Sequence, residues 1–301
     1  MKNLVVSKSL FRRRTPLPIL AVALLLSFVG SHPAFSQTGL KLQLVAEQSA
    51  IIPGKPFTVG LWLNHDPGHH TYWRFPGIVG VPTQLKWALP PGWTAGDLIY
   101  PEPERVHMFK IKAQGFNRDV MLHTEITPPA GLKTGGTLTL HATAFWMCCG
   151  TSCHPGSMDL QLTLPISENA PLNEKWHERL NEERSRAEQP SDAWSTTASV
   201  TGATVTLSLK PANANARLCK SQREAKQIIV FTEDGYFDTD KPQIIRLGND
   251  GSLQFDLIIS ESAASAKTPE TLRAILRNED GWLNDSRLRS LKIAPKILLG
   301  K

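Results

Sequence analysis

The chain has 301 residues with 33 Lys and Arg, 27 Asp and Glu, and a sequence pI of about 9.2. Five of the basic residues and none of the acidic ones precede Gln37, which leaves 28 basic against 27 acidic residues in the rest of the chain. The excess positive charge therefore belongs to the N-terminal segment, and no case for a nucleic-acid partner follows from it.

The N-terminal segment has the pattern of a secretory signal peptide. Lys2, Lys8 and 12–14 form a basic region, Leu17–Val29 an apolar stretch, and 34–36 (Ala-Phe-Ser) a small-x-small cleavage site. The apolar stretch is shorter than the roughly 20 residues that a membrane-spanning helix needs. We predict that residues 1–36 are removed during export to the periplasm; an uncleaved anchor is the alternative.

Residues 37–168 are predicted to form one β domain. The chain alternates polar and apolar residues in short runs rich in Val, Leu, Thr and aromatics, separated by clusters of Pro, Gly, Asn and Asp. This pattern predicts a sandwich of two antiparallel sheets. The expected strands are Leu40–Val45, Phe57–Leu63, Gln84–Leu89, Val106–Lys112, Val120–Ile126, Thr137–Phe145 and Met158–Leu164.

Residues 169–193 break the alternation. Asn173–Gln189 is charged, and acidic and basic side chains recur on one helical face at i,i+4 spacing. We predict a charged, solvent-exposed linker helix that ends before Pro190. Its apolar stripe, Trp176 and Leu180, is too thin to favour the alternative of a partner-binding helix.

Residues 194–301 are predicted to form a second, smaller β-rich domain. Asn249-Asp250-Gly251 is a hairpin signal, and a helix is plausible around Leu218–Ala225. The expected strands are Ser199–Leu209, Gln227–Phe231, Pro242–Leu247, Ser252–Ser260 and Leu272–Arg277.

Three of the four cysteines, Cys148, Cys149 and Cys153, directly follow the strand predicted at 137–145. The intervening Gly-Thr-Ser at 150–152 favours a tight turn, which brings Cys149 and Cys153 within disulfide reach; Cys148–Cys153 is the second choice. Disulfides persist in an exported protein, but four cysteines are too few for a disulfide-dense scaffold. We therefore favour a thiol–disulfide exchange role, with a structural bridge and a metal site as alternatives.

Two further residues bear on this chemistry. His154, next to Cys153, could stabilise a thiolate or shuttle a proton, or it is an exposed loop histidine without a role. The fourth cysteine, Cys219, lies between Arg217 and Lys220, and its function stays open among a bridge, a free thiol and an additional redox thiol.

A histidine-rich stretch at 65–73 invites a metal interpretation. His65, His69 and His70 lie close together, and imidazole suits copper or zinc. His69 and His70 face opposite sides of an extended strand, so one ion cannot easily bind both. A polar loop that enters an aromatic strand is the favoured interpretation, and a copper site at His69 and His70 is the alternative.

Several motifs of the chain resemble the periplasmic amino-terminal region of DsbD-type thiol–disulfide interchange reductases. They lie at 71–77 (TYWRFPG), 80–83 (GVPT), 87–93 (WALPPGW), 100–105 (YPEPER) and 146–155 (WMCCGTSCHP). Two further motifs, 236–238 (YFD) and 280–282 (DGW), are similar to the longer branch associated with copper-sensitivity suppression.

This resemblance implies an immunoglobulin-like sandwich whose cysteine pair relays electrons. It places Cys149 and Cys153 at the redox positions, with Cys148 as a competitor, and it implies an aromatic cap for which Tyr72 and Trp73 are the nearest candidates. No cofactor other than the redox-active disulfide is expected, although bound copper stays an alternative.

The resemblance also implies partners. A membrane-embedded thiol reductase would be the electron donor, and periplasmic disulfide isomerases or thioredoxin-like proteins of cytochrome c maturation would be the acceptors. The membrane and thioredoxin domains of the family are absent from the sequence, so we expect this chain to carry only the relay step of a protein-disulfide reductase. The alternatives are a copper-binding or copper-tolerance protein and a non-catalytic adaptor with a structural disulfide.

Overall fold

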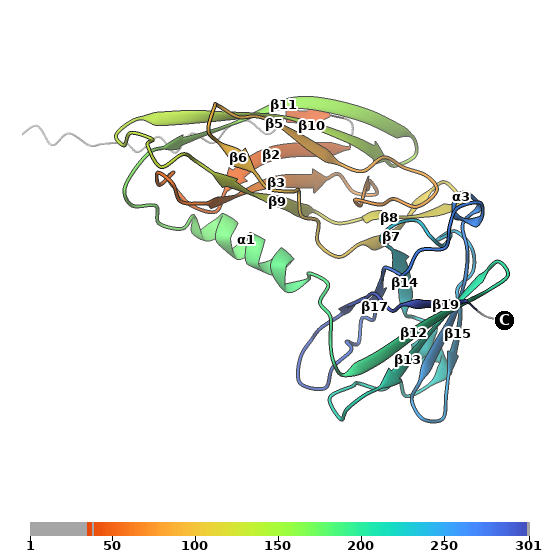
Figure 1. Ribbon diagram of the computed structural model, residues 1–301. Helices are drawn as coiled ribbons and strands as arrows, with labels where there is room; N and C mark the ends of the chain where they lie inside the picture. The colour runs from red at the N-terminus through yellow and green to blue at the C-terminus, as the bar shows by residue number, and fades with distance from the viewer. Residues whose placement is uncertain (1–34, 38, 300–301) are drawn as a thin grey trace, which may run out of the picture. The chain divides into compact units, whose positions relative to one another are not determined.

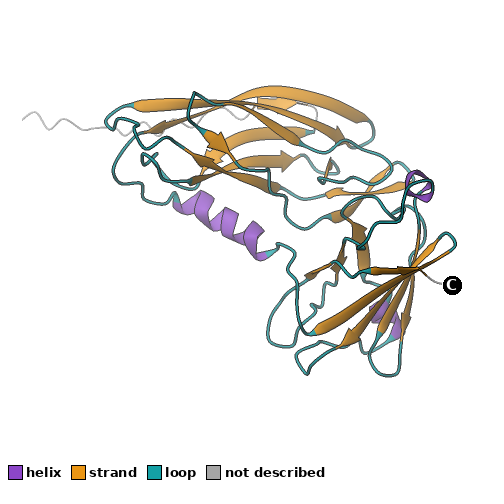
Figure 2. Cartoon of the chain, in the orientation of Figure 1, coloured by secondary structure: helices purple, strands orange, loops and turns teal. Residues whose placement is uncertain are grey.

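The computed structural model describes residues 35–37 and 39–299, and strands predominate in it (Figures 1 and 2). The predicted leader lies outside these residues except for its last two positions, which belong to the first strand. None of the described helices is long and apolar enough to cross a membrane. The mainly β fold expected from the sequence is confirmed.

Residues 35–165 build a β-sandwich from antiparallel sheets. Alternate side chains of the strands point inward and form one core, which includes Leu61, Trp73, Leu122 and Trp146. The first sheet has the order β1 (Phe35–Gln37), β2 (Leu40–Ala46), β3 (Phe57–His65), β9 (Val120–Thr127) and β6 (Thr94–Ala95). The second has the order β11 (Cys153–Pro165), β10 (Thr137–Cys149) and β5 (Gln84–Ala88).

A third, small sheet lies beside the cysteines. Its strands are β4 (Thr71–Tyr72), β8 (Ile111–Phe116) and β7 (Glu104–Met108), in that order. The prediction of one strand over 106–112 is wrong, because the chain turns between Met108 and Ile111 and makes a hairpin. Phe109 takes a positive φ of 56° at this turn. Neither Phe109 nor Lys110 is a turn former, so the alternation appeared continuous.

Residues 194–299 form two further sheets around their own core. The larger has the order β15 (Ile244–Leu247), β16 (Leu253–Ile258), β13 (Thr204–Pro211), β12 (Trp194–Thr201) and β19 (Ile297–Leu299). The smaller has the order β14 (Ile229–Thr232), β17 (Ala274–Arg277) and β18 (Ser290–Ile293), and two short helices are α2 (Gln222–Ala225) and α3 (Glu261–Ala264). The predicted hairpin at Asn249–Gly251 joins β15 to β16. The run predicted at 199–209 is instead a hairpin that turns at Gly202.

The helix α1 (Glu174–Ser185) falls within the predicted linker region, but it is not solvent-exposed throughout. Leu180 is fully buried against Val45 and Met121 of the sandwich. Arg184 donates to both carboxylate oxygens of Glu47 over 2.6 and 2.8 Å, and it holds the pKa of Glu47 at about 2. The buried carboxylate of Glu183 also pairs with Arg118 at 2.7 Å, so a thin apolar stripe and several ion pairs together dock this helix.

The Glu47→Gln variant tests this docking. We expect it to lower the free energy of unfolding at pH 7 by about 2 kcal/mol, because a charge-assisted pair is lost. The pKa of Glu47 is about 2 when folded and near 4.5 when unfolded, so its stabilisation is complete above pH 4.5 and declines as the pH falls toward 2. Urea unfolding should therefore show the difference between wild type and variant shrinking at pH 3. Glu182→Gln, which breaks an exposed pair with Arg179, is the control and should change stability by less than about 0.5 kcal/mol.

Candidate active site at the end of a β-hairpin

The cysteine pair closes the longest hairpin of the molecule's described part. β10 and β11 pair residue by residue from Thr137↔Pro165 to Cys149↔Cys153, and 150–152 form the turn. Cys149 and Cys153 are directly opposite, with Cα atoms 4.0 Å apart, and their Sγ atoms are bonded at 2.07 Å. The structure therefore contains the disulfide that the turn residues suggested.

Strand alternation separates Cys148 from this bond. Cys148 is fully buried in the sandwich core, whereas Cys149 faces a separate small cluster with Tyr72, Val106 and Ala113. Burial raises the pKa of the Cys148 thiol to about 11, and the carboxylate of Asp66 adds to this effect. Cys148 is a free thiol here, and the alternative Cys148–Cys153 bond is not formed.

Tyr72 is the side chain whose polar group contacts the disulfide. Its hydroxyl lies 3.1 Å from Cys149 Sγ, and His70 Nε2 lies 3.4 Å from the same hydroxyl. The backbone of His70 exchanges two hydrogen bonds with that of Cys149, of 2.9 and 3.0 Å. Burial raises the pKa of Tyr72 to about 12, so its hydroxyl stays protonated at neutral pH and can donate to the sulfur.

Close packing fixes the ring of Tyr72. β4 pairs with Gly115 and Phe116 of β8, which places Tyr72 over the small residues of the next strand. Gly80 lies against the ring, and a Cβ there would come within 2.3 Å of two ring carbons. The phenol is therefore held between β8 and the segment that follows β4.

The two bonded cysteine residues differ in exposure. Cys149 is 1% exposed, whereas Cys153 is only half-buried and is flanked by exposed Ser152 and His154. His154 Nε2 is hydrogen-bonded to Ser152 Oγ at 2.7 Å. The effect of this histidine on a thiolate stays a prediction. Of the two cysteines of the bond, Cys153 is thus the one that retains contact with solvent.

Trp73 lies away from the cysteines, unlike its neighbour Tyr72. Its ring is fully buried in the sandwich core, its indole donates to the carbonyl of Pro101 over 3.0 Å, and the guanidinium of Arg74 stacks on it at 3.9 Å. Of the two proposed cap residues, the structure thus brings Tyr72 to Cys149 and places Trp73 in the core.

The sequence reasoning missed the apolar surroundings of the bond. Val106, Ala113, Val79 and Met147 complete the cluster around Cys149 and Cys153. Val106 and Ala113 are directly paired in the β7–β8 hairpin, whose tip residue Phe109 is 74% exposed. Alternation along 104–116 could have suggested which residues share a face, but not that this face meets the cysteines.

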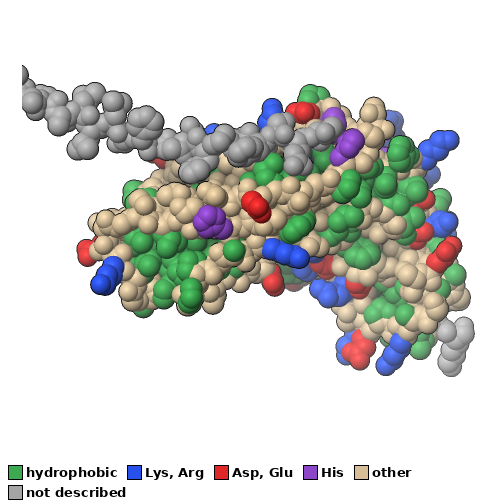
Figure 3. Space-filling view, turned by 90° about the horizontal axis from the view of Figure 1, so that it is seen from above, with side chains coloured by type: hydrophobic (Ala, Val, Ile, Leu, Met, Phe, Trp, Pro, Cys, Tyr) green, Lys and Arg blue, Asp and Glu red, His purple; other side chains and the backbone are tan. Residues whose placement is uncertain are grey.

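Exposed hydrophobic residues lie in the segments that enclose this cluster. Ile78 and Val81 are 52% and 42% exposed and flank Val79, which packs against the cluster itself. Figure 3 shows hydrophobic side chains at several places on one face of the molecule. Apolar side chains exposed beside a reactive bond are typical of a surface that contacts another protein.

The histidines of the 65–73 stretch do not converge. His65 Nε2 is bonded to Thr71 Oγ1 at 3.0 Å, His69 Nδ1 lies 3.3 Å from the carbonyl of Pro67, and His70 is next to Tyr72. Burial lowers the pKa of both His65 and His70 to about 4. Within 39–299, no three His, Cys, Asp or Glu side chains are arranged to hold a metal ion.

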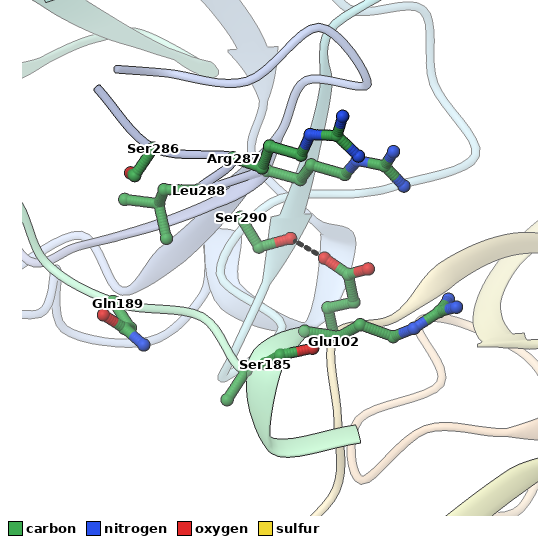
Figure 4. A pocket seen from close by; sticks show the side chains of 10 residues that line it. Glu102, Ser185, Gln189, Ser286, Arg287, Leu288 and Ser290 are labelled. Carbon is green, nitrogen blue, oxygen red and sulfur yellow. Dashed lines mark hydrogen bonds between the residues drawn. The ribbon is translucent and has the colours of Figure 1, made fainter. Parts of the chain in front are cut away.

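Cys219 and a cavity lined by Glu102 and Ser290 contribute no residue to the site around the disulfide. Cys219 is a free thiol in the core of residues 193–293, and burial raises its pKa to about 11. A cavity of about 440 Å³ is lined by Glu102, Gln189, Arg287 and Ser290 among others, and Ser290 donates to Glu102 there (Figure 4). None of the cysteines lines this cavity.

Comparison with known proteins agrees with this site. Residues 41–165 match the family model of the N-terminal part of thiol:disulfide interchange protein DsbD. The N-terminal periplasmic domain of ScsB from Proteus mirabilis is similar in structure, with a TM-score of 0.59, 17% identity, and coverage of 86% of this chain and 94% of that one. The reduced N-terminal domain of Neisseria meningitidis DsbD aligns at 9% identity and a TM-score of 0.24, over 45% of this chain and 90% of that one. A comparison with curated protein sequences gives no match.

The family match supports thiol–disulfide interchange with thiol redox partners as the general function, and the Cys149–Cys153 disulfide provides the group that it requires. The ScsB match establishes the fold over most of the chain. It covers the second β-rich region as well as the sandwich.

Gly80→Ala tests the packing of Tyr72. A side chain at Gly80, whose φ is +98°, is strained and also collides with the phenol ring, so we expect a loss of about 2–4 kcal/mol in the free energy of unfolding. Gly135→Ala is the matched control, because Gly135 has a φ of +91° and a Cβ added there would meet nothing within 4 Å; its loss should be about 1 kcal/mol. Equal losses in urea unfolding would show that the Tyr72 ring is free to move aside.

Proposed function

We propose, because residues 41–165 match the model of the N-terminal part of thiol:disulfide interchange protein DsbD, that Cys149 and Cys153 cycle between disulfide and dithiol to relay electrons between partner proteins. The observation that carries the proposal is the asymmetry of the bond. Cys153 is only half-buried, while Cys149 is buried and its sulfur lies beside a hydroxyl donor.

This asymmetry assigns different roles to the two cysteines. A thiolate of the electron donor attacks Cys153 Sγ, the Sγ–Sγ bond breaks, and its electron pair stays on Cys149 as a thiolate. The donor is then linked to Cys153 in a mixed disulfide. A second thiolate of the donor then attacks the donor sulfur of this mixed disulfide. Cys153 leaves as a thiolate, and the donor is left with a disulfide of its own.

The reverse sequence passes the electrons on. The Cys153 thiolate attacks a disulfide of the acceptor, and Cys149 then attacks Cys153 Sγ, which restores the intramolecular bond and releases the acceptor as a dithiol. Two electrons enter and two leave, so no further cofactor is needed.

Tyr72 assists the step in which Cys149 carries negative charge. A buried thiolate loses the hydrogen bonds that water would donate to it, and burial therefore raises the pKa of a thiol. The Tyr72 hydroxyl, 3.1 Å from Cys149 Sγ, can donate to the departing sulfur because its own pKa of about 12 keeps it protonated. His70 Nε2, at 3.4 Å, is placed to accept or donate at the far side of the same hydroxyl.

The family match and the predicted leader support a proposal for the partners and the compartment. We propose a periplasmic protein whose electron donor is a membrane-embedded thiol reductase and whose acceptors are thioredoxin-like proteins or disulfide isomerases, including those of cytochrome c maturation. The exposed Ile78 and Val81, next to the cluster that holds the disulfide, suit the apolar contact that such partners need.

Single-cysteine variants test the roles. Cys149→Ser leaves the accessible Cys153 thiol, which should react with an aromatic disulfide reagent at least about tenfold faster than the buried Cys149 thiol of Cys153→Ser. Stopped-flow absorbance measures both rates on folded protein. Cys219→Ser, the control, should keep the disulfide and its rate of reduction by dithiothreitol.

Two outcomes would contradict the proposal. Equal reactivity of the two single-cysteine variants would remove the assignment of roles. A wild-type disulfide that dithiothreitol reduces only after urea unfolding would make the bond structural, as in the adaptor alternative.

A further inference from the structure

The edge of strand β14 is closed by two glutamine side chains instead of a neighbouring strand. Gln243 donates to the carbonyl of Val230 over 2.7 Å and accepts from its N–H over 3.0 Å. Gln114 does the same for Thr232, donating over 2.9 Å and accepting over 2.8 Å. In each case an amide side chain replaces the peptide group of a missing strand.

The two glutamines differ in origin. Gln243 precedes β15 within the second β-rich region, whereas Gln114 belongs to β8 of the small sheet beside the cysteines. Gln114 is fully buried, and its contact with Thr232 joins residues that are 118 positions apart in the chain. An unpaired buried amide is costly, so this contact is a fixed attachment point.

Gln114 also holds the segment that follows Tyr72. Its side-chain nitrogen donates to the carbonyl of Phe75 over 2.5 Å, in addition to Thr232. Its backbone accepts from the N–H of Trp73 over 3.0 Å and donates to the carbonyl of Pro76 over 2.7 Å. One residue thus links β14 to both ends of the segment 73–76.

Further contacts attach the same segment and strand to residues 233–240. Arg74 forms an ion pair with Glu233. The backbone N–H of Lys112 donates to the Asp240 carboxylate over 2.9 Å, and Lys112 Nζ donates to the Asp240 carbonyl over 3.0 Å. The ring of Phe75 lies against Gly235, where a Cβ would come within 2.2 Å of it.

The small sheet transmits this attachment to the disulfide. β8 alternates, so Lys112 and Gln114 contact residues 232–240 while Ala113 lies in the cluster of Tyr72 and Cys149. Gly115, next to Gln114, pairs with Tyr72 itself. The phenol is therefore between an anchored strand and the disulfide.

We propose that Gln114 is a positioning residue through which the second β-rich region holds the Tyr72 hydroxyl against Cys149 Sγ. The inference rests on the proposed function, because it assigns residues 232–240 a part in tuning the exchange reaction. It gives the second β-rich region a part in a relay whose two cysteines, Cys149 and Cys153, both lie in the sandwich.

The test is the ionisation of the reduced full chain, followed by thiolate absorbance at 240 nm between pH 5 and 10. Cys148 and Cys219 have pKa values near 11 and contribute little in that range. Tyr72→Phe should lower the thiolate fraction at pH 7 about tenfold, and Gln114→Ala should lower it about threefold to tenfold, because one donated hydrogen bond to the sulfur is lost or weakened. Combined with Tyr72→Phe, Gln114→Ala should have no additional effect.

Gln243→Ala is the matched control. It removes the same pair of amide hydrogen bonds from the same strand, and it should leave the thiolate fraction within about twofold of wild type at a similar loss of stability. Asp240→Ala is a milder second variant for the case that Gln114→Ala does not fold. It should lower the thiolate fraction by about twofold.

The outcomes separate this inference from the proposed function. A normal thiolate fraction in Gln114→Ala and Asp240→Ala, with the Tyr72→Phe effect intact, would overturn the positioning role alone. Equal effects of Gln114→Ala and Gln243→Ala on the thiolate fraction would also overturn the positioning role, because a general loss of stability would then explain both. A disulfide that cannot be reduced in the folded chain would instead overturn the function itself.

Discussion

The register of the β10–β11 hairpin is the constraint on which the rest of the site depends. Because the two strands pair without interruption up to Cys149↔Cys153, the disulfide forms between directly opposed residues at the hairpin end. The same alternation turns Cys148 into the sandwich core and Cys149 toward Tyr72. A slip of one residue would exchange these two environments, so the long hairpin specifies which thiol can react.

Burial then determines the chemistry at each group. It keeps Cys148 and Cys219 protonated and out of exchange, with pKa values near 11. It keeps Tyr72 protonated as well, which is what a hydrogen-bond donor to a thiolate requires. Of the two bonded cysteines, only Cys153 is partly exposed, whereas Cys149, the proposed leaving group, is buried in the apolar cluster.

Much of this could be predicted from residue patterns, and the failures have physical reasons. Alternating runs and the turn at 150–152 predicted the sandwich strands and the Cys149–Cys153 pair, because both depend on local geometry. The hairpin at Phe109 and the burial of Leu180 were not predicted, since a non-Gly residue at positive φ and a two-residue apolar stripe give weak local signals. The neighbours of Cys149 were also beyond prediction, because they come from strands paired only in three dimensions, as does the contact of Gln114 with Thr232.

The reduction potential of the Cys149–Cys153 bond tests the central claim most directly. It can be measured by equilibrating the folded chain with dithiothreitol or glutathione buffers and quantifying the dithiol by mass spectrometry after alkylation. An exchanging pair should have a potential of roughly −180 to −270 mV, in the range of thiol–disulfide oxidoreductases. A value below about −300 mV, typical of bonds that resist cellular thiols, would contradict the account and make the disulfide structural.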